Sequence, residues 1–292
     1  MASSREMRLR IKSVGDLAQV TRALKTVSAS KVRKAMASNA ASLPYSQKAW
    51  QVLTDLARQP GHTSLHPLLR ERKTINRVLA ILVTSDKGLA GSYNMNVVKN
   101  TLEFFSTFTS PVDYVCIGKK GRDLLLRRKC KVIADFSELS DPVTFLDISP
   151  VAHLVVDDFL EEKYDQVLIA YTRFESMAKQ TPEVRKLLPL AVEPIAGETQ
   201  RTAVQSSVFI YEPAQEVILD EIIPRFTAMQ IFQSVLSSQA SEHAARTFAM
   251  ANATDNANAL VNQLTMEYNK IRQQTITNDM LDIIGGAAAH EN

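Results

Sequence analysis

The segment TSDKGLAGSYN, from Thr84 to Asn94, is the first place where residue types and spacing could support chemistry. It follows an apolar run and precedes a helical one, which is where glycine-rich loops bind phosphate through backbone N–H groups. The segment departs from the P-loop pattern, which needs G-x-x-x-x-G-K followed by Ser or Thr, and from G-x-G-x-x-G. We therefore favour a tight turn between a strand and a helix, with a nucleotide site as the alternative.

A second pair of glycines lies in IGKKGRD, from Ile117 to Asp123. A GXXG loop is the element with which KH domains clamp RNA, so RNA binding is one interpretation of this segment. In KH domains the loop lies between helices, whereas Gly118 follows an expected strand and has no flanking aromatic pair on which bases would stack. The segment is therefore weak evidence for RNA binding.

The titratable side chains do not assemble an active site at the level of sequence. The five histidines are scattered, without the spacing of a metal site or of a nucleophile with its base. Asp157 and Asp158, with Glu161 and Glu162, lie at one expected helix end, where a solvated face is the better interpretation. The two cysteines form no disulfide framework and indicate a reducing compartment. This composition favours a protein that moves or holds other proteins.

The central part of the chain alternates between short apolar runs and helical stretches. The runs RVLAILVTS, VDYVCIG, QVLIAYTRF and SSVFIYE are rich in Val, Ile and Tyr, as strands buried on both faces are. Helical stretches are expected at about residues 94–108, 119–129 and 149–163. The proline-spaced segment KQTPEVRKLLPLAVEPIAGETQ is expected to be a loop. Strands alternating with helices predict a Rossmann-like α/β domain of mostly parallel strands, which we place at residues 77–212.

Both ends of the chain are expected to be long helices. Over residues 1–58 the apolar residues recur every three or four positions and predict a narrow seam of Met7, Ile11, Val14, Leu17, Val20, Leu24 and Val27. Pro44 is expected to bend or divide this helix, because proline removes a backbone donor. Residues 59–76 are expected to be a linker, and residues 213–292 a second helix in which Pro224 produces a kink or a new start. The two helices would pair as an antiparallel coiled coil.

The C-terminal helix is built largely from small and polar residues. Residues 237–259, SSQASEHAARTFAMANATDNANA, suit close approach of a helix on one side and a loosely held partner on the other. At 1.5 Å per residue, about 70 helical residues reach roughly 105 Å, several times the diameter of a small domain. Most of this helix must therefore lie beyond its own α/β domain, as a thin rod inside another protein. A solvated, Ala-rich helix is the alternative.

Positive charge is concentrated at the start of the chain. The net charge is +3, and residues 1–34 contain nine Lys or Arg against two acidic residues. This basic helix is expected to have an anionic partner. The start also resembles a transit peptide, but its helical periodicity continues past any cleavage point, so we expect it to be retained. No apolar run has the length of a membrane span, so any membrane role is expected to be peripheral.

Three separated segments carry a resemblance to a known family. They are RLRIKSVGDLAQVTRALKTVSASKVRKA near the start, VTSDKGLAGSYNMNV in the middle and SEHAARTFAMANATDNANALVNQLTMEYNKIRQQTITNDMLDIIGGAAA near the end. In this order and spacing they resemble the gamma subunit of F-type ATP synthase, across essentially the full chain. The resemblance implies a coiled coil that stands inside a ring of three alpha and three beta subunits. It also implies an α/β domain that sits on the membrane rotor ring, the c-ring, beside the epsilon subunit.

The resemblance further implies a mechanism and a set of contacts. As the central rotor shaft, the chain would contact each catalytic beta subunit differently, coupling proton flow to ATP synthesis or hydrolysis, with no cofactor and no catalysis of its own. Contacts with beta are implied for Arg272, Gln273, Arg246, Lys25, Lys31, Arg33 and Lys34. Contacts with the rotor ring and epsilon are implied for Tyr211 and Glu212. A bacterial protein, peripheral at the cytoplasmic face of the plasma membrane, is implied in preference to an organellar one.

Two other classes of protein stay open at this level. An α/β enzyme that uses its helices only to oligomerise would bind nucleotide as the isolated chain. A nucleic-acid-binding coiled coil would show a strongly salt-dependent affinity for DNA or RNA. The absence of interleaved aromatic residues in residues 1–34 weighs against the second class.

Overall fold

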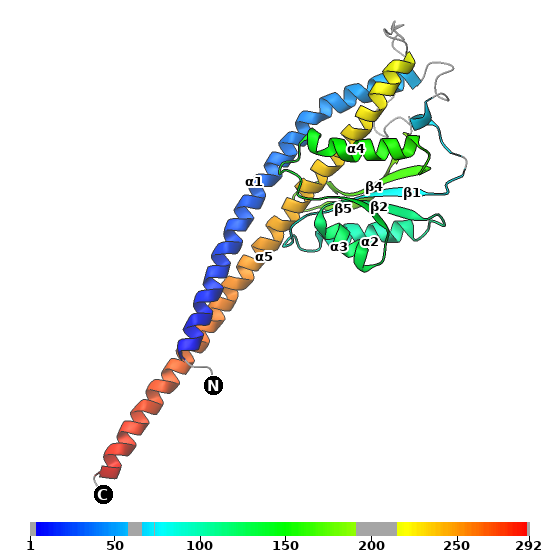
Figure 1. The fold of residues 1–292 in the computed structure, drawn as a ribbon. Coiled ribbons are helices and arrows are strands. Elements are labelled where there is room, and N and C mark those ends of the chain that lie inside the picture. Colours follow the sequence, from blue (N-terminus) through cyan, green and yellow to red (C-terminus); the bar gives the residue numbers. More distant parts are fainter. Residues whose placement is uncertain (1–3, 58–65, 73, 191–214, 291–292) are drawn as a thin grey trace. The chain divides into compact units, whose positions relative to one another are not determined.

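A computed structural model of the 292-residue chain describes residues 4–57, 66–72, 74–190 and 215–290. The two ends of the described chain are long helices, α1 (Ser4–Ala57) and α5 (Gln215–His290). Both helices were expected from the apolar period and from the absence of glycine over most of their length. The two terminal helices are confirmed (Figure 1).

The chain divides into two compact units. Residues 1–29 and 246–292 form a helical unit, and residues 30–245 form an α/β unit. Helices α1 and α5 each continue through both units.

The α/β unit is built on a five-stranded sheet in the order β3-β2-β1-β4-β5. Its strands are β1 (Val78–Val83), β2 (Val112–Ile117), β3 (Val132–Phe136), β4 (Gln166–Phe174) and β5 (Gln180–Leu188). The first four strands run parallel to their neighbours, whereas β5 is antiparallel to β4. All of β1 is buried, as expected for a central strand covered on both faces. The predicted Rossmann-like sheet of mostly parallel strands is confirmed.

Helices cover both faces of this sheet. They are α2 (Tyr93–Phe105), α3 (Lys119–Arg127) and α4 (Phe145–Leu160). On one face α2 and α3 pack against Ala80 and Leu82 of β1. On the other face α4 and α5 pack against Leu79 and Ile81 of the same strand (Figure 1). Because successive side chains of a strand point to opposite faces, β1 contributes to two apolar cores.

The loop expected at residues 179–200 is wrong for its first part, which forms strand β5. This strand lies at the edge of the sheet, where Pro182 is tolerated because one side of the backbone needs no donor. Charged residues such as Arg185 and Lys186 interrupt the apolar pattern of this strand, so apolar runs alone do not predict it. The strand expected at SSVFIYE lies outside the described residues.

Neither proline divides its helix. Helix α1 continues through Pro44, and α5 begins at Gln215 and continues through Pro224, so division at Pro44 and a new start at Pro224 are wrong. The alternatives, a bend at Pro44 and a kink at Pro224, stay predictions. Pro44 lies on an exposed face, where water can satisfy the carbonyl that loses its partner. Beyond Pro44 the helix is held by packing, because the Trp50 ring stacks on Phe226 of α5 with 5.4 Å between the ring centroids.

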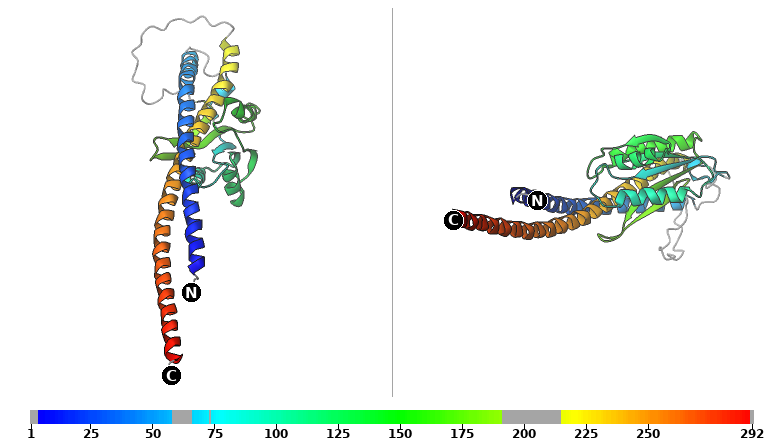
Figure 2. Two further views of the ribbon diagram at one scale, coloured as in Figure 1. Left: turned by 90° about the vertical axis from the view of Figure 1, so that its left-hand side faces the viewer. Right: turned by 90° about the horizontal axis from the view of Figure 1, so that it is seen from below.

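In the helical unit, α1 and α5 pair in opposite directions. The hydroxyl oxygens of Thr21 and Thr254 lie 2.8 Å apart, and Arg8 Nε donates to the Tyr268 hydroxyl at 2.8 Å. The residue number therefore falls in α1 as it rises in α5, and Figure 2 shows the two helices side by side. The predicted antiparallel pairing is confirmed. Helix α5 continues past the start of α1 (Figure 1).

The seam of this pair differs from the predicted one. Ala18, Thr21 and Ser28 are buried, whereas Leu17, Val20 and Val27 are more than half exposed. The predicted seam is therefore wrong by one position at Leu17, Val20 and Val27, whereas Met7 is buried and Ile11, Val14 and Leu24 are half-buried. The buried Thr21 and Ser28 keep the seven-residue spacing that starts at Met7, and the small size of Ala18, Thr21 and Ser28 lets the two backbones approach closely. No helix in the described part of the chain is both long and apolar enough to cross a membrane.

Candidate functional site

The turn between β1 and α2 is closed by its own side chains. Asn94 Oδ1 accepts a hydrogen bond from the Ser85 N–H at 3.0 Å, and Ser85 Oγ donates to the Lys87 carbonyl at 2.7 Å. Gly91 has a φ of 58°, in the left-handed region that glycine adopts without strain. The tight turn predicted for TSDKGLAGSYN is confirmed.

The first turn of α3 is also satisfied from within the chain. The N–H groups of residues 119–121 donate to Asp86 Oδ1, Ser85 O and Thr84 Oγ1, at 3.0, 3.1 and 2.9 Å. Free N–H groups at a helix start are the usual donors to a bound phosphate. Here the Asp86 carboxylate already takes the position of such an anion. The helix start that best resembles a phosphate site therefore uses its donors to join α3 to the end of β1.

The two glycines of IGKKGRD allow this close contact. Gly118 has a φ of 102°, and a Cβ atom there would lie 2.3 Å from the Thr84 carbonyl oxygen. A Cβ atom at Gly121 would lie 2.6 Å from Thr84 Oγ1. The GXXG spacing is explained by the packing of α3 on β1, and it places no free loop where RNA would be clamped.

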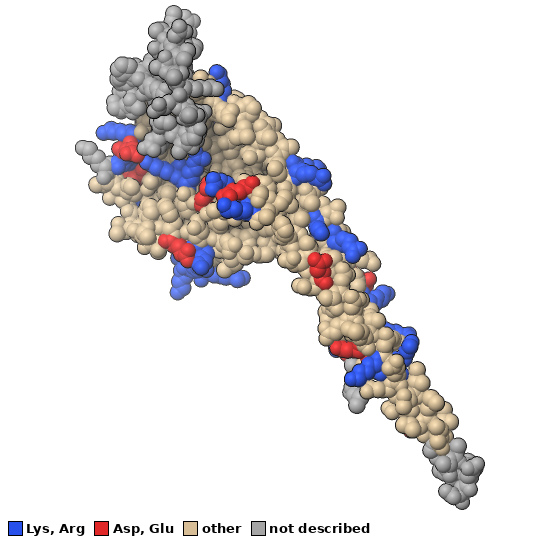
Figure 3. Space-filling view, turned by 180° about the vertical axis from the view of Figure 1, so that it is seen from behind, with Lys and Arg blue, Asp and Glu red and all other residues tan. Residues whose placement is uncertain are grey.

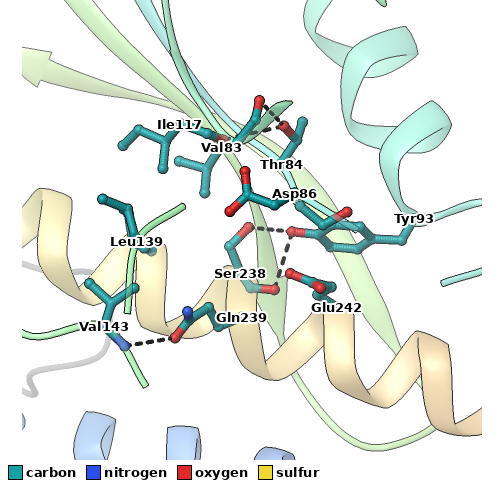
Figure 4. Close-up of a pocket in the computed structure, with 13 residues that line it drawn as sticks. Val83, Thr84, Asp86, Tyr93, Ile117, Leu139, Val143, Ser238, Gln239 and Glu242 are labelled. Atoms are coloured by element: carbon teal, nitrogen blue, oxygen red, sulfur yellow. Dashed lines mark hydrogen bonds between the residues drawn. The ribbon is translucent and has the colours of Figure 1, made fainter. Parts of the chain in front are cut away.

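The carboxyl edge of the sheet is where open α/β folds bind ligands, at the point where the strand order reverses. In this sheet the reversal lies between β1 and β4. Helix α5 crosses that point and leaves a cavity of about 40 Å³, lined by polar groups of Asp86, Tyr93, Ser238 and Glu242 (Figure 4). Such a volume accommodates a few water molecules and is far too small for a nucleotide.

Lys31 lies in the α/β unit and is engaged by an acidic side chain of the same chain. Its Nζ atom is 2.6 Å from Asp141 Oδ2, and His243 Nε2 is 3.4 Å from Asp141 Oδ1. Hydrogen bonds from His243 and Lys31 hold the pKa of Asp141 well below its usual range. Asp141 therefore joins α1, through Lys31, to α5, through His243.

A family model described as ATP synthase matches residues 3–289. The ATP synthase gamma chain of Dehalococcoides mccartyi (strain CBDB1) is 41% identical over 291 residues, which cover 99% of each chain. The chain belongs to the ATP synthase gamma-chain family. A second gamma chain, from Roseiflexus castenholzii, is 39% identical over 292 residues and again covers 99% of each chain.

Solved structures share the gamma-chain fold at lower identity. A chain in the central stalk and c-ring of Tetrahymena thermophila mitochondrial ATP synthase superposes with a TM-score of 0.59 and 23% identity, covering 80% of this chain and 99% of that one. A chain in the Euglena gracilis mitochondrial ATP synthase, in its OSCP, F1 and c-ring assembly, gives a TM-score of 0.65 and 18% identity, covering 98% and 94%. At these identities the likeness concerns the fold.

The contacts implied by the gamma-chain resemblance are divided between the two units. Lys25, Arg246, Arg272 and Gln273 belong to the helical unit. Arg246 is half-buried there, whereas the other three are exposed. The register set by the contacts of Thr21 and Arg8 places Arg272 level with the first turn of α1.

The remaining implied contacts differ in their surroundings. Arg33 and Lys34 lie in the α/β unit and are exposed, unlike the engaged Lys31. Tyr211 and Glu212 lie outside the described residues. The face of the helices seen in Figure 3 carries Lys and Arg side chains at intervals, with acidic side chains between them.

Two groups of residues were missed by reasoning from the gamma-chain sequence. One is the exposed apolar group of Leu17, Val20 and Val27, assigned to the seam because apolar period alone does not say which helix face is covered. The other is the serine group of Ser237, Ser238 and Ser241, described only as a small and polar surface. The density of serine in SSQAS was the available signal, because buried hydroxyls need partners.

Proposed function

We propose that this chain is the central-stalk rotor subunit of a proton-translocating F-type ATP synthase. It turns within the ring of alpha and beta subunits and couples rotation of the c-ring to the conformational cycle of the catalytic beta subunits. The observation that carries this proposal is the match of the ATP synthase family model over residues 3–289, for which a relative 41% identical over 291 residues supplies the subunit, the gamma chain. A rotor that contacts each beta conformation differently shifts the population of those conformations without performing the chemistry itself.

The α/β unit supports a role without catalysis. Its two ligand positions, the start of α3 and the carboxyl edge between β1 and β4, are taken by Asp86 and by helix α5. The central stalk therefore acts through contact, and ATP is bound and converted by its partners. An enzyme of Rossmann-like class would keep at least one of these positions open.

The helical unit supports enclosure by other subunits. Leu17, Val20 and Val27 expose more than half of their surface on a helix pair whose seam is made of small residues. Large apolar side chains in such a row are typical of a surface that another protein covers. The alpha and beta subunits are the partners that would cover it.

Polar contacts with beta would make the strength of the interaction differ from one beta conformation to the next. We assign these contacts to Arg272, Gln273, Arg246, Lys25, Arg33 and Lys34, and among exposed charges each pair would contribute less than about 1 kcal/mol. Lys31 is the weakest of the implied contacts, because Asp141 already holds its ammonium group. Tyr211 and Glu212 would meet the c-ring and the epsilon subunit. The subunit would be peripheral, at the cytoplasmic face of a bacterial plasma membrane.

Co-purification tests this proposal. A tagged chain would be recovered from its native membranes, the partners identified by mass spectrometry, and ATP hydrolysis assayed with and without the chain. Recovery of alpha, beta and epsilon, with ATP hydrolysis that depends on this chain although the chain alone binds no ATP, supports the proposal. Recovery of the chain without these subunits, or nucleotide binding by the isolated chain in calorimetry, contradicts it.

A further inference from the structure

Strand β4 extends beyond its neighbour β1. The pairing of β1 with β4 ends at Leu82 and Ala170, whereas β4 continues to Phe174. Past Ala170 the backbone of β4 has β5 on one side only. Backbone groups on the other side would be left without partners, at a cost comparable to that of a lost hydrogen bond.

Serine side chains of α5 take the place of the missing strand. Ser238 Oγ accepts a hydrogen bond from the Thr172 N–H at 3.3 Å, and Ser237 Oγ accepts one from the Phe174 N–H at 2.9 Å. Ser241 Oγ donates to the Thr172 carbonyl at 3.2 Å. The bonded groups belong to alternate residues of β4, which is the period expected of groups that point to one side of a strand.

A tyrosine from α2 joins the same group. The Tyr93 hydroxyl lies 2.8 Å from Ser238 Oγ and donates to the Ser238 carbonyl at 3.2 Å (Figure 4). Both side chains are buried. We call the set of Ser237, Ser238, Ser241 and Tyr93, with the backbone of Thr172 and Phe174, the helix seat. It connects β4, α2 and α5 at a single place.

The bonds of the helix seat resist motion in a way that apolar packing does not. Apolar contact is non-directional, so two smooth surfaces can shift with little loss. A turn or slide of α5 would break several seat bonds together and leave buried backbone groups unpaired, which is unfavourable because these groups would have neither protein nor water partners. Serine is suited to this role because its short side chain bonds to the sheet only when the helix backbone lies close.

We propose that the helix seat is the joint through which torque passes between the α/β unit and helix α5. The inference rests on the proposed central-stalk function. Helix α5 runs unbroken from the seat into the helical unit, so a force that turns the α/β unit reaches the rest of α5 through the seat. The seat residues act as positioning residues and touch no substrate.

The test uses the complete ATP synthase complex reconstituted in vesicles. The variant S237A/S238A/S241A removes the three hydroxyls and keeps α5 helical, because alanine is the best helix former. The matched control is S234A, whose hydroxyl bonds to the Gln230 carbonyl within α5 itself. ATP hydrolysis and ATP-driven proton transport are measured on the same vesicles, with and without an opposing proton gradient.

The expected result is a loss of proton transport per ATP hydrolysed, greatest against the opposing gradient, in the triple variant alone. An unchanged ratio in a fully assembled triple variant overturns the proposal, because a purely structural seat would alter stability only. If the triple variant does not assemble, Y93F is tested in its place, because it removes one hydroxyl of the helix seat and keeps the serine bonds to β4. An unchanged ratio of proton transport to ATP hydrolysis in Y93F then overturns the proposal. Failure of the central-stalk function itself is distinguishable, because the unsubstituted complex would then show no transport that depends on this chain.

Discussion

Thr21 of α1 and Thr254 of α5 face each other in the helical unit with their hydroxyl oxygens 2.8 Å apart, although 233 positions separate them in the chain. Each hydroxyl also lies within reach of a carbonyl of its own helix, at Ala18 and at Met250. Both threonines are buried in a seam of small residues. Small apolar residues alone specify a register weakly, so this polar pair helps to fix the alignment of the two helices.

The first prediction concerns this pair. T21V removes one hydroxyl and keeps the side-chain shape, so it should lower the local stability of the helical unit by about 1 kcal/mol. T254V alone should behave similarly, whereas T21V/T254V should cost less than the two single changes together, because the contact between the two hydroxyls is then lost only once. Hydrogen exchange of the amides around residues 21 and 254 measures these differences. Strict additivity of the two changes would contradict a direct interaction.

The second prediction concerns Gly118. G118A should lower the free energy of unfolding by about 2 kcal/mol or more, because alanine is strained at positive φ. Its Cβ atom would also lie 2.3 Å from the Thr84 carbonyl oxygen, so that the backbone itself must move. G88A is the matched control in the neighbouring turn, since a Cβ atom at Gly88 meets nothing within 4 Å. Denaturant unfolding of the two variants should separate them, and equal midpoints would contradict the close packing of α3 on β1.

The features that could be predicted from sequence are those with a continuous apolar signal. β1, β2 and β4 are such runs because the central strands are buried. The edge strands β3 and β5 were not predicted. Strand β5 mixes half-buried and charged residues such as Arg185, so it contains no continuous apolar run. An edge strand has one neighbour and little burial, so its composition resembles that of a loop.

The seam and the serine group could not be predicted, for a different reason. Apolar period shows which residues share a helix face, but Leu17 and Val20 are apolar although the described part of the chain leaves more than half of each exposed. Thr21 occupies the seam instead, because a small side chain lets helices α1 and α5 approach each other closely. The role of Ser238 depends on the length of β4 relative to β1, which is a property of the assembled sheet.

The third prediction concerns His66, which precedes the short 3-10 helix η1 (Pro67–Leu69). His66 Nδ1 accepts a hydrogen bond from the Leu68 N–H at 3.2 Å, and Nε2 lies 3.0 Å from Asp220 Oδ1. The neutral ring with its proton on Nε2 satisfies both partners. Burial lowers the pKa of His66 below its ordinary 6.5, although Asp220 opposes the shift.

A lowered folded-state pKa defines the sign of the pH effect. The stabilisation from His66 is fully present above about pH 6.5 and is lost as the pH falls towards the folded-state pKa, because the unfolded chain takes up the proton more readily. Thermal unfolding between pH 7.5 and 5.5 should therefore show a fall in stability that is reduced in H66N, where an amide oxygen can still cap Leu68. D220N should steepen the fall, because it removes the charge that favours protonation. An H66N variant with the full wild-type pH dependence would assign the effect to other groups.

The fourth prediction separates a residue engaged within the chain from one available to a partner. Lys31 and Lys34 lie one turn apart on α1, but Lys31 is paired with Asp141 and Lys34 is exposed. K31A should lower the stability of the isolated chain by about 0.5–1 kcal/mol, the range of a partly exposed ion pair, whereas K34A should leave the stability within about 0.5 kcal/mol of the unsubstituted chain.

In the assembled complex the order should reverse, with K34A lowering ATP-driven proton transport more than K31A does. The reason is that Lys34, unlike Lys31, is not paired with Asp141, so its charge can meet an acidic surface of beta. Thermal unfolding of the two chains and transport assays of the two complexes measure both halves. If K31A lowers transport more than K34A while leaving stability unchanged, then Lys31 exchanges Asp141 for a carboxylate of the partner, and the pairing seen in the chain alone gives way in the complex.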